Sequence, residues 1–335
     1  MRALVLQDDA GIDNLHIAEQ PAAEPGPGQI VVTMKAASLN YRDLATITAP
    51  MIKGRLPLIP LSDGCGVVSG IGEGVTRVKV GDRVAPMFFQ GWLGGEPTGH
   101  ALATALGGAL DGVAREHMVL SQEGVSKVPE YLTDEEAACL PCAGLTAWRA
   151  LVVEGRIKPG DVVLAQGTGG VSIFALQFAK AAGATVIITS SSDAKLERAR
   201  ALGADHTINY RTEPDWAKAA RRLTGGRGVD HVVEVGGAGT FQQSIQAIRL
   251  GGHIGVVGVL SGAVKDLSVA AIFGANARIH GVTVGSREHF EAMCRALEVG
   301  QIHPVVDKRF ALDDARSAFR SMQAGEHFGK IVLDI

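Results

Sequence analysis

The sequence has few aromatic residues, few cysteines and little net charge. Aromatic residues make up 5% of the 335 positions and hydrophobic residues 46%, so aliphatic side chains must build the core, and intrinsic disorder is excluded. Four cysteines are too few for a disulfide framework, which predicts a reducing, cytoplasmic location. The net charge of -3 provides no positive field for a polyanion, so no nucleic-acid partner is expected.

Long apolar runs are also missing. The N-terminus MRALVLQDDA carries acids where a signal peptide has its apolar core, and no stretch of about 18 residues stays apolar. We therefore expect neither export nor a membrane partner. Glycine, by contrast, is abundant, at 43 of 335 residues, or about 13% against ~7% in average proteins. Many positions must need a positive φ or a close approach of two backbone segments.

The first third of the chain reads as short strands separated by glycine and proline, which predicts an antiparallel β-rich domain. Strands are expected from Ile30 in IVVTMKAAS and from Gly66 in GVVSGIGEGV. Residues 87–115 lack periodicity and are rich in glycine, which predicts a long loop. A helix is expected to start at Thr133, because Thr133 and Glu136 have the spacing of a capping box.

Strands and helices alternate after residue 160. The predicted strands are VVLAQ, TVIIT, HTIN, VDHVVEV and HIGVVGV, with helical segments between them. Such alternation requires right-handed crossovers, so it predicts an α/β fold with a doubly wound parallel sheet. Helices resume near Ser286, and the chain closes with the predicted strand KIVLDI. We expect this last segment to return to the first domain.

A glycine-rich turn follows the strand VVLAQ directly. The run Gly167-Thr168-Gly169-Gly170-Val171 opens a predicted helix. Glycines let the backbone turn sharply and approach a pyrophosphate, whose charge is stabilised by the free N–H groups and positive dipole of the helix start. The third glycine of the dinucleotide fingerprint is replaced here by the small Ser172. This context predicts a dinucleotide site, and an ordinary strand-to-helix turn is the alternative.

The end of the second strand of this region distinguishes the two nicotinamide cofactors. An NAD site has Asp or Glu there for the ribose hydroxyls, whereas this chain has Ser190 and Ser191, with Lys195 shortly after. Hydroxyls accept a 2′-phosphate without repulsion, and Lys195 adds a positive charge. The nearest acid, Asp193, is explained as a first-turn charge of the next helix. We therefore predict NADP(H) rather than NAD.

Together these features resemble the medium-chain dehydrogenase/reductase superfamily, and within it the zinc-less quinone-oxidoreductase-like branch. The resemblance covers essentially the whole length. It implies a GroES-like substrate domain of residues 1–124 and 285–335, a Rossmann domain of residues 125–284, a nicotinamide in the cleft between them, and a homodimer. Besides the glycine turn, its markers are AASLNYRDL from Ala36, PLSDGCGVVSGIGEGV from Pro60, GDRV from Gly81, LPCAGLTAW from Leu140, and HFGKIVL near the end.

The resemblance also assigns site residues. In NADP-dependent relatives a Lys and, fifteen residues later, a Tyr hold the 2′-phosphate, and Lys195 and Tyr210 have that spacing. The Leu-Thr-Ala-Trp stretch of relatives touches the nicotinamide, which implies the same role for Thr146. The further cofactor-binding residues expected are Gly258, Val259, Gly329 and Lys330.

The zinc alcohol dehydrogenases of the superfamily hold a catalytic metal with a Cys, a His-Glu pair and a second Cys or Asp. In this chain Asn40 replaces the first Cys, Ser62 and Asp63 replace the His-Glu pair, and only Cys142 remains. A catalytic zinc needs about three protein ligands, so no metal is expected. Cys139 and Cys142 form a CxxC spacing without a second such motif in the chain. We expect both thiols to pack as small hydrophobic side chains, and a redox or metal motif is the alternative.

Without zinc to polarise a carbonyl, reduction must rely on hydrogen bonds to a developing oxyanion, which favours an enone or quinone, where the charge is delocalised. Asn40 and Tyr41 are candidates for contacts to the nicotinamide or the substrate oxygen, although Tyr41 equally fits cleft packing. Asp43 is expected to orient Asn40 or Arg42, with a role as general acid as the alternative.

The sequence therefore predicts an NADPH-dependent, metal-independent oxidoreductase that transfers hydride to an activated double bond of a small-molecule substrate. One alternative is an NADP-linked alcohol dehydrogenase or carbonyl reductase. Another is a non-catalytic NADPH-binding protein.

Overall fold

A computed structural model describes residues 1–22, 24–49 and 54–335, and the chain forms two compact units. Unit 1 comprises Met1–Leu145 and Val284–Ile335, and unit 2 comprises Thr146–Thr283. The first boundary lies beyond the expected residue 124, because β7 (Val125–Lys127) pairs with a strand of unit 1. In the described part of the chain, no helix combines the length and apolar character needed to cross a membrane.

Unit 1 is built on a seven-stranded sheet with the order β14-β15-β3-β4-β5-β7, in which β6 also pairs with β3. The long strand β3 pairs antiparallel with β4, β6 and β15, so the C-terminal segment completes this sheet. The predicted β-rich domain is confirmed, whereas the separate pair β1–β2 was not expected. The strands are β1 (Arg2–Leu6), β2 (Leu15–Glu19), β3 (Gln29–Ser38), β4 (Asp63–Ile71), β5 (Arg83–Pro86), β6 (His117–Ser121), β7, β14 (Val306–Ala311) and β15 (Lys330–Asp334).

The helices of unit 1 match several local signals. Thr133 caps α3 through its side chain, and the Glu136 carboxylate accepts the Thr133 N–H at 2.9 Å, which confirms the capping box. Residues 87–115 contain only one short helix and isolated bridges, in agreement with the predicted loop. The helices are α1 (Tyr41–Thr48), α2 (Gly99–Leu102), α3 (Asp134–Ala138), α10 (Arg287–Gly300) and α11 (Ala315–Gln323).

The segment after α3 stays helical but leaves α-helical geometry. Pro141 lies at the start of a π-helical turn over Leu140–Gly144, which α4 (Leu145–Trp148) and a second π-helical turn, Arg149–Glu154, follow. Proline lacks an N–H group and therefore cannot continue the α-helical hydrogen-bond pattern. The helical segment is therefore interrupted at this residue.

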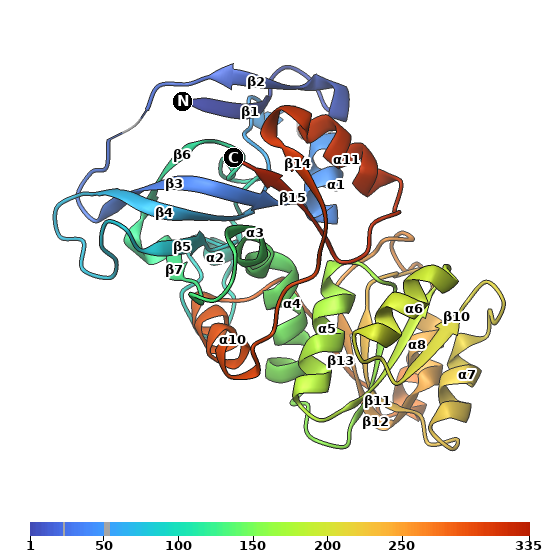
Figure 1. The fold of residues 1–335 in the computed structure, drawn as a ribbon. Helices are drawn as coiled ribbons and strands as arrows, with labels where there is room; N and C mark the ends of the chain where they lie inside the picture. Colours follow the sequence, from blue (N-terminus) through green and yellow to red (C-terminus); the bar gives the residue numbers. More distant parts are fainter. Residues whose placement is uncertain (23, 50–53) are drawn as a thin grey trace. The chain divides into compact units, whose positions relative to one another are not determined.

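Unit 2 is a six-stranded parallel sheet with the order β10-β9-β8-β11-β12-β13 and helices around it (Figure 1). This confirms the doubly wound α/β fold, with β13 as a sixth strand that was not expected. The chain order reverses between the neighbours β8 and β11, where ligands of such sheets bind beyond the carboxyl ends. The elements are β8 (Val162–Gln166), α5 (Gly170–Ala181), β9 (Thr185–Ser190), α6 (Asp193–Ala201), β10 (His206–Asn209), α7 (Trp216–Leu223), β11 (Val229–Glu234), α8 (Phe241–Ala247), β12 (Ile248–Val256), α9 (Val269–Gly274) and β13 (Arg278–Gly281).

Candidate functional site

The glycine turn lies at the carboxyl end of β8. Gly167 has a φ of 74°, and a Cβ there would meet nothing within 4 Å, so the backbone conformation, not crowding, requires glycine. Gly169 is the N-cap of α5 and provides no side-chain cap, so the first-turn N–H groups depend on other acceptors. The Oγ of the buried Ser172 donates to the carbonyl of Gln166 at 2.5 Å. This hydrogen bond holds the start of α5 on the end of β8.

The serine, lysine and tyrosine expected around a 2′-phosphate lie at the carboxyl ends of β9 and β10. Ser190 ends β9 and is buried, and the backbone N–H of Tyr210 donates to its carbonyl at 3.1 Å. Ser191 is half-buried, and Tyr210 is 42% exposed. Lys195 lies in the first turn of α6, where its backbone N–H donates to the Ser192 Oγ at 3.4 Å. These residues offer hydroxyls and an ammonium group to an anion at this edge.

Asp193, the nearest acid, is engaged within the protein. It lies in the first turn of α6, and its Oδ1 accepts a hydrogen bond from the Asn209 Nδ2 at 2.8 Å. Its place agrees with the helix-start interpretation of this carboxylate.

The remaining predicted residues of unit 2 differ in accessibility. A Cβ on Gly258 would lie 2.7 Å from the carbonyl oxygen of Val235, so only glycine fits after β12. The next residue, Val259, is 60% exposed. Thr146 in α4 is buried.

In unit 1, Asn40 and Asp43 lie at the start of α1. Asp43 is fully buried, and its Oδ2 accepts the Asn40 backbone N–H at 2.8 Å. Its Oδ1 accepts Nη1 of Arg42 at 3.0 Å, and the same Nη1 donates to the Leu106 carbonyl at 2.8 Å. Burial raises the pKa of Asp43 against the opposing effect of Arg42. The carboxylate thus orients both Asn40 and Arg42.

Lys330 joins this cluster from β15, next to Gly329, which has a φ of 79°. Its side chain is buried, and Nζ donates to the Leu39 carbonyl and to Asn40 Oδ1, both at 2.6 Å. The resemblance implies that Lys330 lies at the cofactor, and its ammonium binds the amide oxygen of Asn40, itself a candidate contact to the nicotinamide. Tyr41, in contrast to its neighbour Asn40, is 53% exposed.

The residues at the positions of the zinc ligands of relatives form hydrogen bonds with one another. Asp63 is fully buried, its Oδ1 accepts the Ser62 Oγ at 2.6 Å, and its Oδ2 accepts the Cys142 backbone N–H at 2.8 Å. Burial raises the pKa of Asp63 to about 6, although Lys330 lowers it. Burial and, after it, Asp63 raise the pKa of the Cys142 thiol.

These side chains do not fit a catalytic zinc. Across residues 1–22, 24–49 and 54–335, no group of three or more His, Cys, Asp or Glu could hold a metal ion. Cys139 is buried, and its Sγ donates to the Glu135 carbonyl at 3.1 Å, as expected for a small packed side chain.

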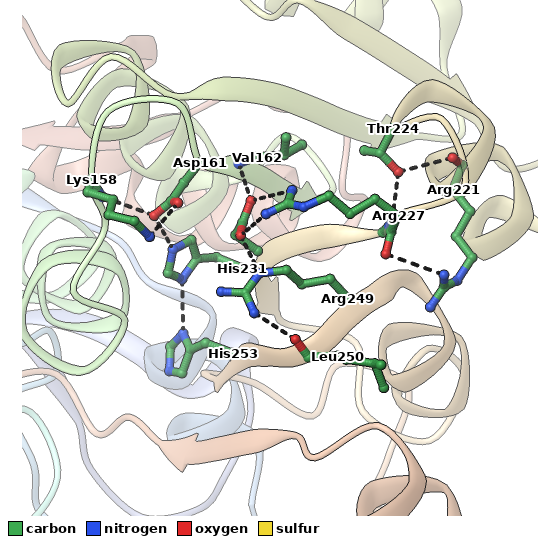
Figure 2. Close-up of polar contacts among 12 residues, drawn as sticks. Lys158, Asp161, Val162, Arg221, Thr224, Arg227, His231, Arg249, Leu250 and His253 are labelled. Carbon is green, nitrogen blue, oxygen red and sulfur yellow. Dashed lines mark hydrogen bonds and ion pairs between the residues drawn. The ribbon is translucent and has the colours of Figure 1, made fainter.

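A polar cluster at the amino ends of the unit 2 strands was not predicted. His231 lies between Asp161 and His253 (Figure 2), with Nε2 3.0 Å from Asp161 Oδ2 and Nδ1 3.5 Å from His253 Nδ1. Burial lowers the pKa of both histidines, that of His253 to about 3. These imidazoles are therefore neutral in the folded protein at neutral pH.

A buried carboxylate next to this cluster is paired with arginines. Asp230, near the start of β11, accepts Nη2 of Arg227 at 2.6 Å and Nε of Arg249 at 2.5 Å, and both arginines are drawn in Figure 2. Burial alone would raise the pKa of Asp230, but the two arginines outweigh it and lower the pKa to about 2. This ion pairing lies at the opposite edge of the sheet from the glycine turn.

Family models match both parts of the chain. A model described as alcohol dehydrogenase GroES-like domain matches residues 26–130, and one described as zinc-binding dehydrogenase matches residues 170–298. A zinc-type alcohol dehydrogenase-like protein of Schizosaccharomyces pombe is 44% identical over 100% of this chain and 99% of the relative. The chain belongs to the medium-chain dehydrogenase/reductase superfamily. The resemblance that the sequence motifs carry is confirmed, and this superfamily member is an NAD(P)H-dependent oxidoreductase.

Other members of the superfamily differ in their activities. A 2-haloacrylate reductase of a Burkholderia species is 31% identical over 99% of this chain and 98% of its own. The solved structure of an NAD-dependent alcohol dehydrogenase is 38% identical, with a TM-score of 0.89 and full coverage of both chains. Two mycobacterial structures, one a quinone oxidoreductase and one complexed with NADPH, are each 28% identical, with TM-scores of 0.81 and full coverage of both chains.

Proposed function

We propose that this protein reduces activated double bonds, in an enone or a quinone, with NADPH and without a metal. The observation that carries the proposal is the hydrogen bonding of the residues at the positions where zinc relatives bind their metal. Asn40 accepts the Lys330 ammonium, and Asp63 accepts the Ser62 hydroxyl and the Cys142 backbone N–H. A buried ammonium and satisfied carboxylate oxygens cannot polarise a simple carbonyl as a metal does. The related 2-haloacrylate reductase and quinone oxidoreductase support this substrate class.

The proposed cofactor fits the residues of unit 2. Ser190, Ser191, Lys195 and Tyr210 offer neutral or positive groups to a 2′-phosphate, and the uncapped start of α5 suits a pyrophosphate. The mycobacterial relative complexed with NADPH supports this choice. When bound, the nicotinamide supplies a hydride from its C4. Gly258 and Val259, after β12, complete the proposed cofactor-binding set of this unit.

In the proposed reaction, the β-carbon of the substrate receives the hydride, and the electron pair of the double bond moves onto the carbonyl oxygen as an enolate. A proton then reaches the α-carbon and completes the reduction. Tyr41, the exposed residue of the α1 start, is the proposed donor to the substrate oxygen. Asp43 holds Asn40 and Arg42 in place, and Thr146 is the proposed contact to the nicotinamide.

A kinetic comparison tests this proposal. The loss of NADPH absorbance is followed with an enone, with its saturated ketone and with a quinone, each with and without a chelator. We expect turnover of the enone or quinone, slow turnover of the saturated ketone and no effect of the chelator. Dependence on added zinc would contradict the metal-free reaction.

A second candidate function is that of an NADP-linked alcohol dehydrogenase or carbonyl reductase, which the names of several relatives favour. It predicts that the saturated ketone reacts as fast as the enone. Tight NADPH binding without turnover of any of these substrates would instead indicate a non-catalytic NADPH-binding protein. A homodimer in the cytoplasm remains a prediction, and light scattering of the purified protein tests the dimer.

A further inference from the structure

The carboxyl end of β11 holds a buried carboxylate that the proposed reaction does not use. Glu234 is the last residue of β11 and is fully buried. Its Oε1 accepts the backbone N–H groups of Gly236 and Gly237, at 2.8 and 3.0 Å, and the Thr240 hydroxyl. The carboxylate therefore closes the turn between β11 and α8 onto the end of its own strand.

The other carboxylate oxygen of Glu234 reaches the neighbouring strand. Oε2 accepts Gln166 Nε2 at 2.7 Å and the Ser244 hydroxyl. Gln166 is the last residue of β8, directly before Gly167, and its own Oε1 accepts the backbone N–H of Val235 at 3.2 Å. Side chains from adjacent strands thus hold each other at the point where the glycine turn begins.

The backbone of Glu234 adds a third strand end. Its carbonyl accepts the N–H groups of Val257 at 2.8 Å and Gly258 at 3.2 Å, just after β12. One residue therefore joins the carboxyl ends of β8, β11 and β12. The reversal of strand order between β8 and β11 is where sheets of this kind bind a dinucleotide.

We propose that Glu234 is a positioning residue of the dinucleotide site, whose carboxylate sets the shape of the glycine turn and of the segment at Gly258. This inference deepens the proposed function and rests on it. The donors to the carboxylate are all neutral N–H or O–H groups, so an amide in its place would turn an NH2 group toward at least one donor. A buried polar group without its partner then displaces the turns that it held.

The test compares Glu234→Gln with Asp230→Asn. Both replace a buried carboxylate of β11, but Asp230 lies near the amino end of the strand, where it pairs with arginines. Each variant is titrated with NADPH and with NADH by fluorescence, well below its unfolding temperature, and the KM for NADPH and kcat are measured separately.

We expect Glu234→Gln to lower the affinity for NADPH and for NADH by the same factor, at least about tenfold. It should also raise the KM for NADPH more than it lowers kcat. Asp230→Asn is expected to lower the unfolding temperature while both affinities stay within twofold of the wild type. Wild-type affinities in Glu234→Gln would overturn the inference, and so would an equal loss of affinity in Asp230→Asn, because affinity would then follow general stability.

A milder variant covers the case in which Glu234→Gln does not fold. Thr240→Val removes one hydrogen-bond donor to the carboxylate and keeps the side-chain volume. It should weaken the binding of NADPH and of NADH by about threefold. Unchanged binding in this variant, with Glu234→Gln unfolded, would assign Glu234 to stability alone and overturn the inference. If the wild type binds neither nucleotide, both the proposed function and this inference fail. If it prefers NADH, only the proposed cofactor fails.

Discussion

The two edges of the parallel sheet in unit 2 stabilise their carboxylates in opposite ways. At the amino edge, Asp230 binds two arginines, Asp161 binds Lys158, and Asp205 binds Lys180. At the carboxyl edge, Glu234 has only neutral donors among its hydrogen bonds. The amino edge thus has its charges balanced within the protein. The carboxyl edge keeps positive helix starts for an anion from outside.

This comparison separates stability from binding. Helix C-termini lie at the amino edge, where basic side chains are favourable, so the ion pairs there need no ligand. At the carboxyl edge, hydrogen bonds between neutral groups and one carboxylate define backbone positions. Variants at the amino edge should therefore change unfolding, and variants at the carboxyl edge should change nucleotide binding.

The largest expected effect concerns Lys195 in the first turn of α6 at the carboxyl edge. A hydrogen bond to a charged group contributes roughly 1.5 to 3 kcal/mol. Lys195→Ala should therefore weaken NADPH binding by about ten- to a hundredfold and leave NADH binding nearly unchanged. Lys180→Ala at the amino edge removes a half-exposed ion pair with Asp205 and should leave both affinities unchanged. Isothermal titration with both nucleotides measures this, and an equal loss for NADPH and NADH in Lys195→Ala would contradict the 2′-phosphate contact.

A second effect, on pH dependence, belongs to the amino edge. Burial, with His231 and His280 nearby, lowers the pKa of His253 to about 3, below the value of about 6.5 in an unfolded chain. Between these values the unfolded state binds more protons, so stability is lost as the pH falls below about 6.5. At pH 5 this loss is on the order of 2 kcal/mol for His253.

Urea unfolding at pH 7.5 and pH 5 measures this loss. In His253→Leu the difference between the two pH values should shrink by that amount, while NADPH affinity at pH 7.5 stays that of the wild type. The same pH dependence in variant and wild type would show that other groups control acid stability.

The smallest effect comes from a pair of glycines at the two ends of β8. Gly160 precedes β8 with a φ of 84° and Gly167 follows it with a φ of 74°, and a Cβ at either position would meet nothing within 4 Å. Replacement by Ala forces a left-handed backbone and should cost about 1 kcal/mol of stability at each site. Only Gly167→Ala should also weaken NADPH. Titration with NADPH measures the affinity, and thermal unfolding measures the stability. An equal loss of NADPH affinity in Gly160→Ala would show that the two edges do not differ as proposed.

Local sequence signals predicted many elements correctly. The capping box of Thr133 with Glu136 and the glycine turn at Gly167 each depend on residues close in the chain. Short strands were harder to predict. The strands β1, β13 and β14 were not predicted, because their few residues show no clear alternation of apolar and polar side chains. Pairing with neighbouring strands stabilises them instead.

Contacts between distant residues account for the rest. The ammonium of Lys330 binds Asn40, which lies 290 positions away in the chain, and no local pattern indicates this pairing. Glu234 and Gln166, 68 positions apart, carry no motif that marks them as partners. The row of Asp161, His231 and His253 likewise forms only when adjacent strands align.

By itself, the sequence determined the alternation of strands and helices, the glycine turn and the absence of a zinc ligand set, because each depends on which residues stand at nearby positions. The tertiary structure alone decided which buried charges meet. A buried carboxylate or ammonium is stable only with partners, and the sheet brings those partners from distant strands. For this reason the ion-paired amino edge and the neutral network around Glu234 became visible only in the folded chain.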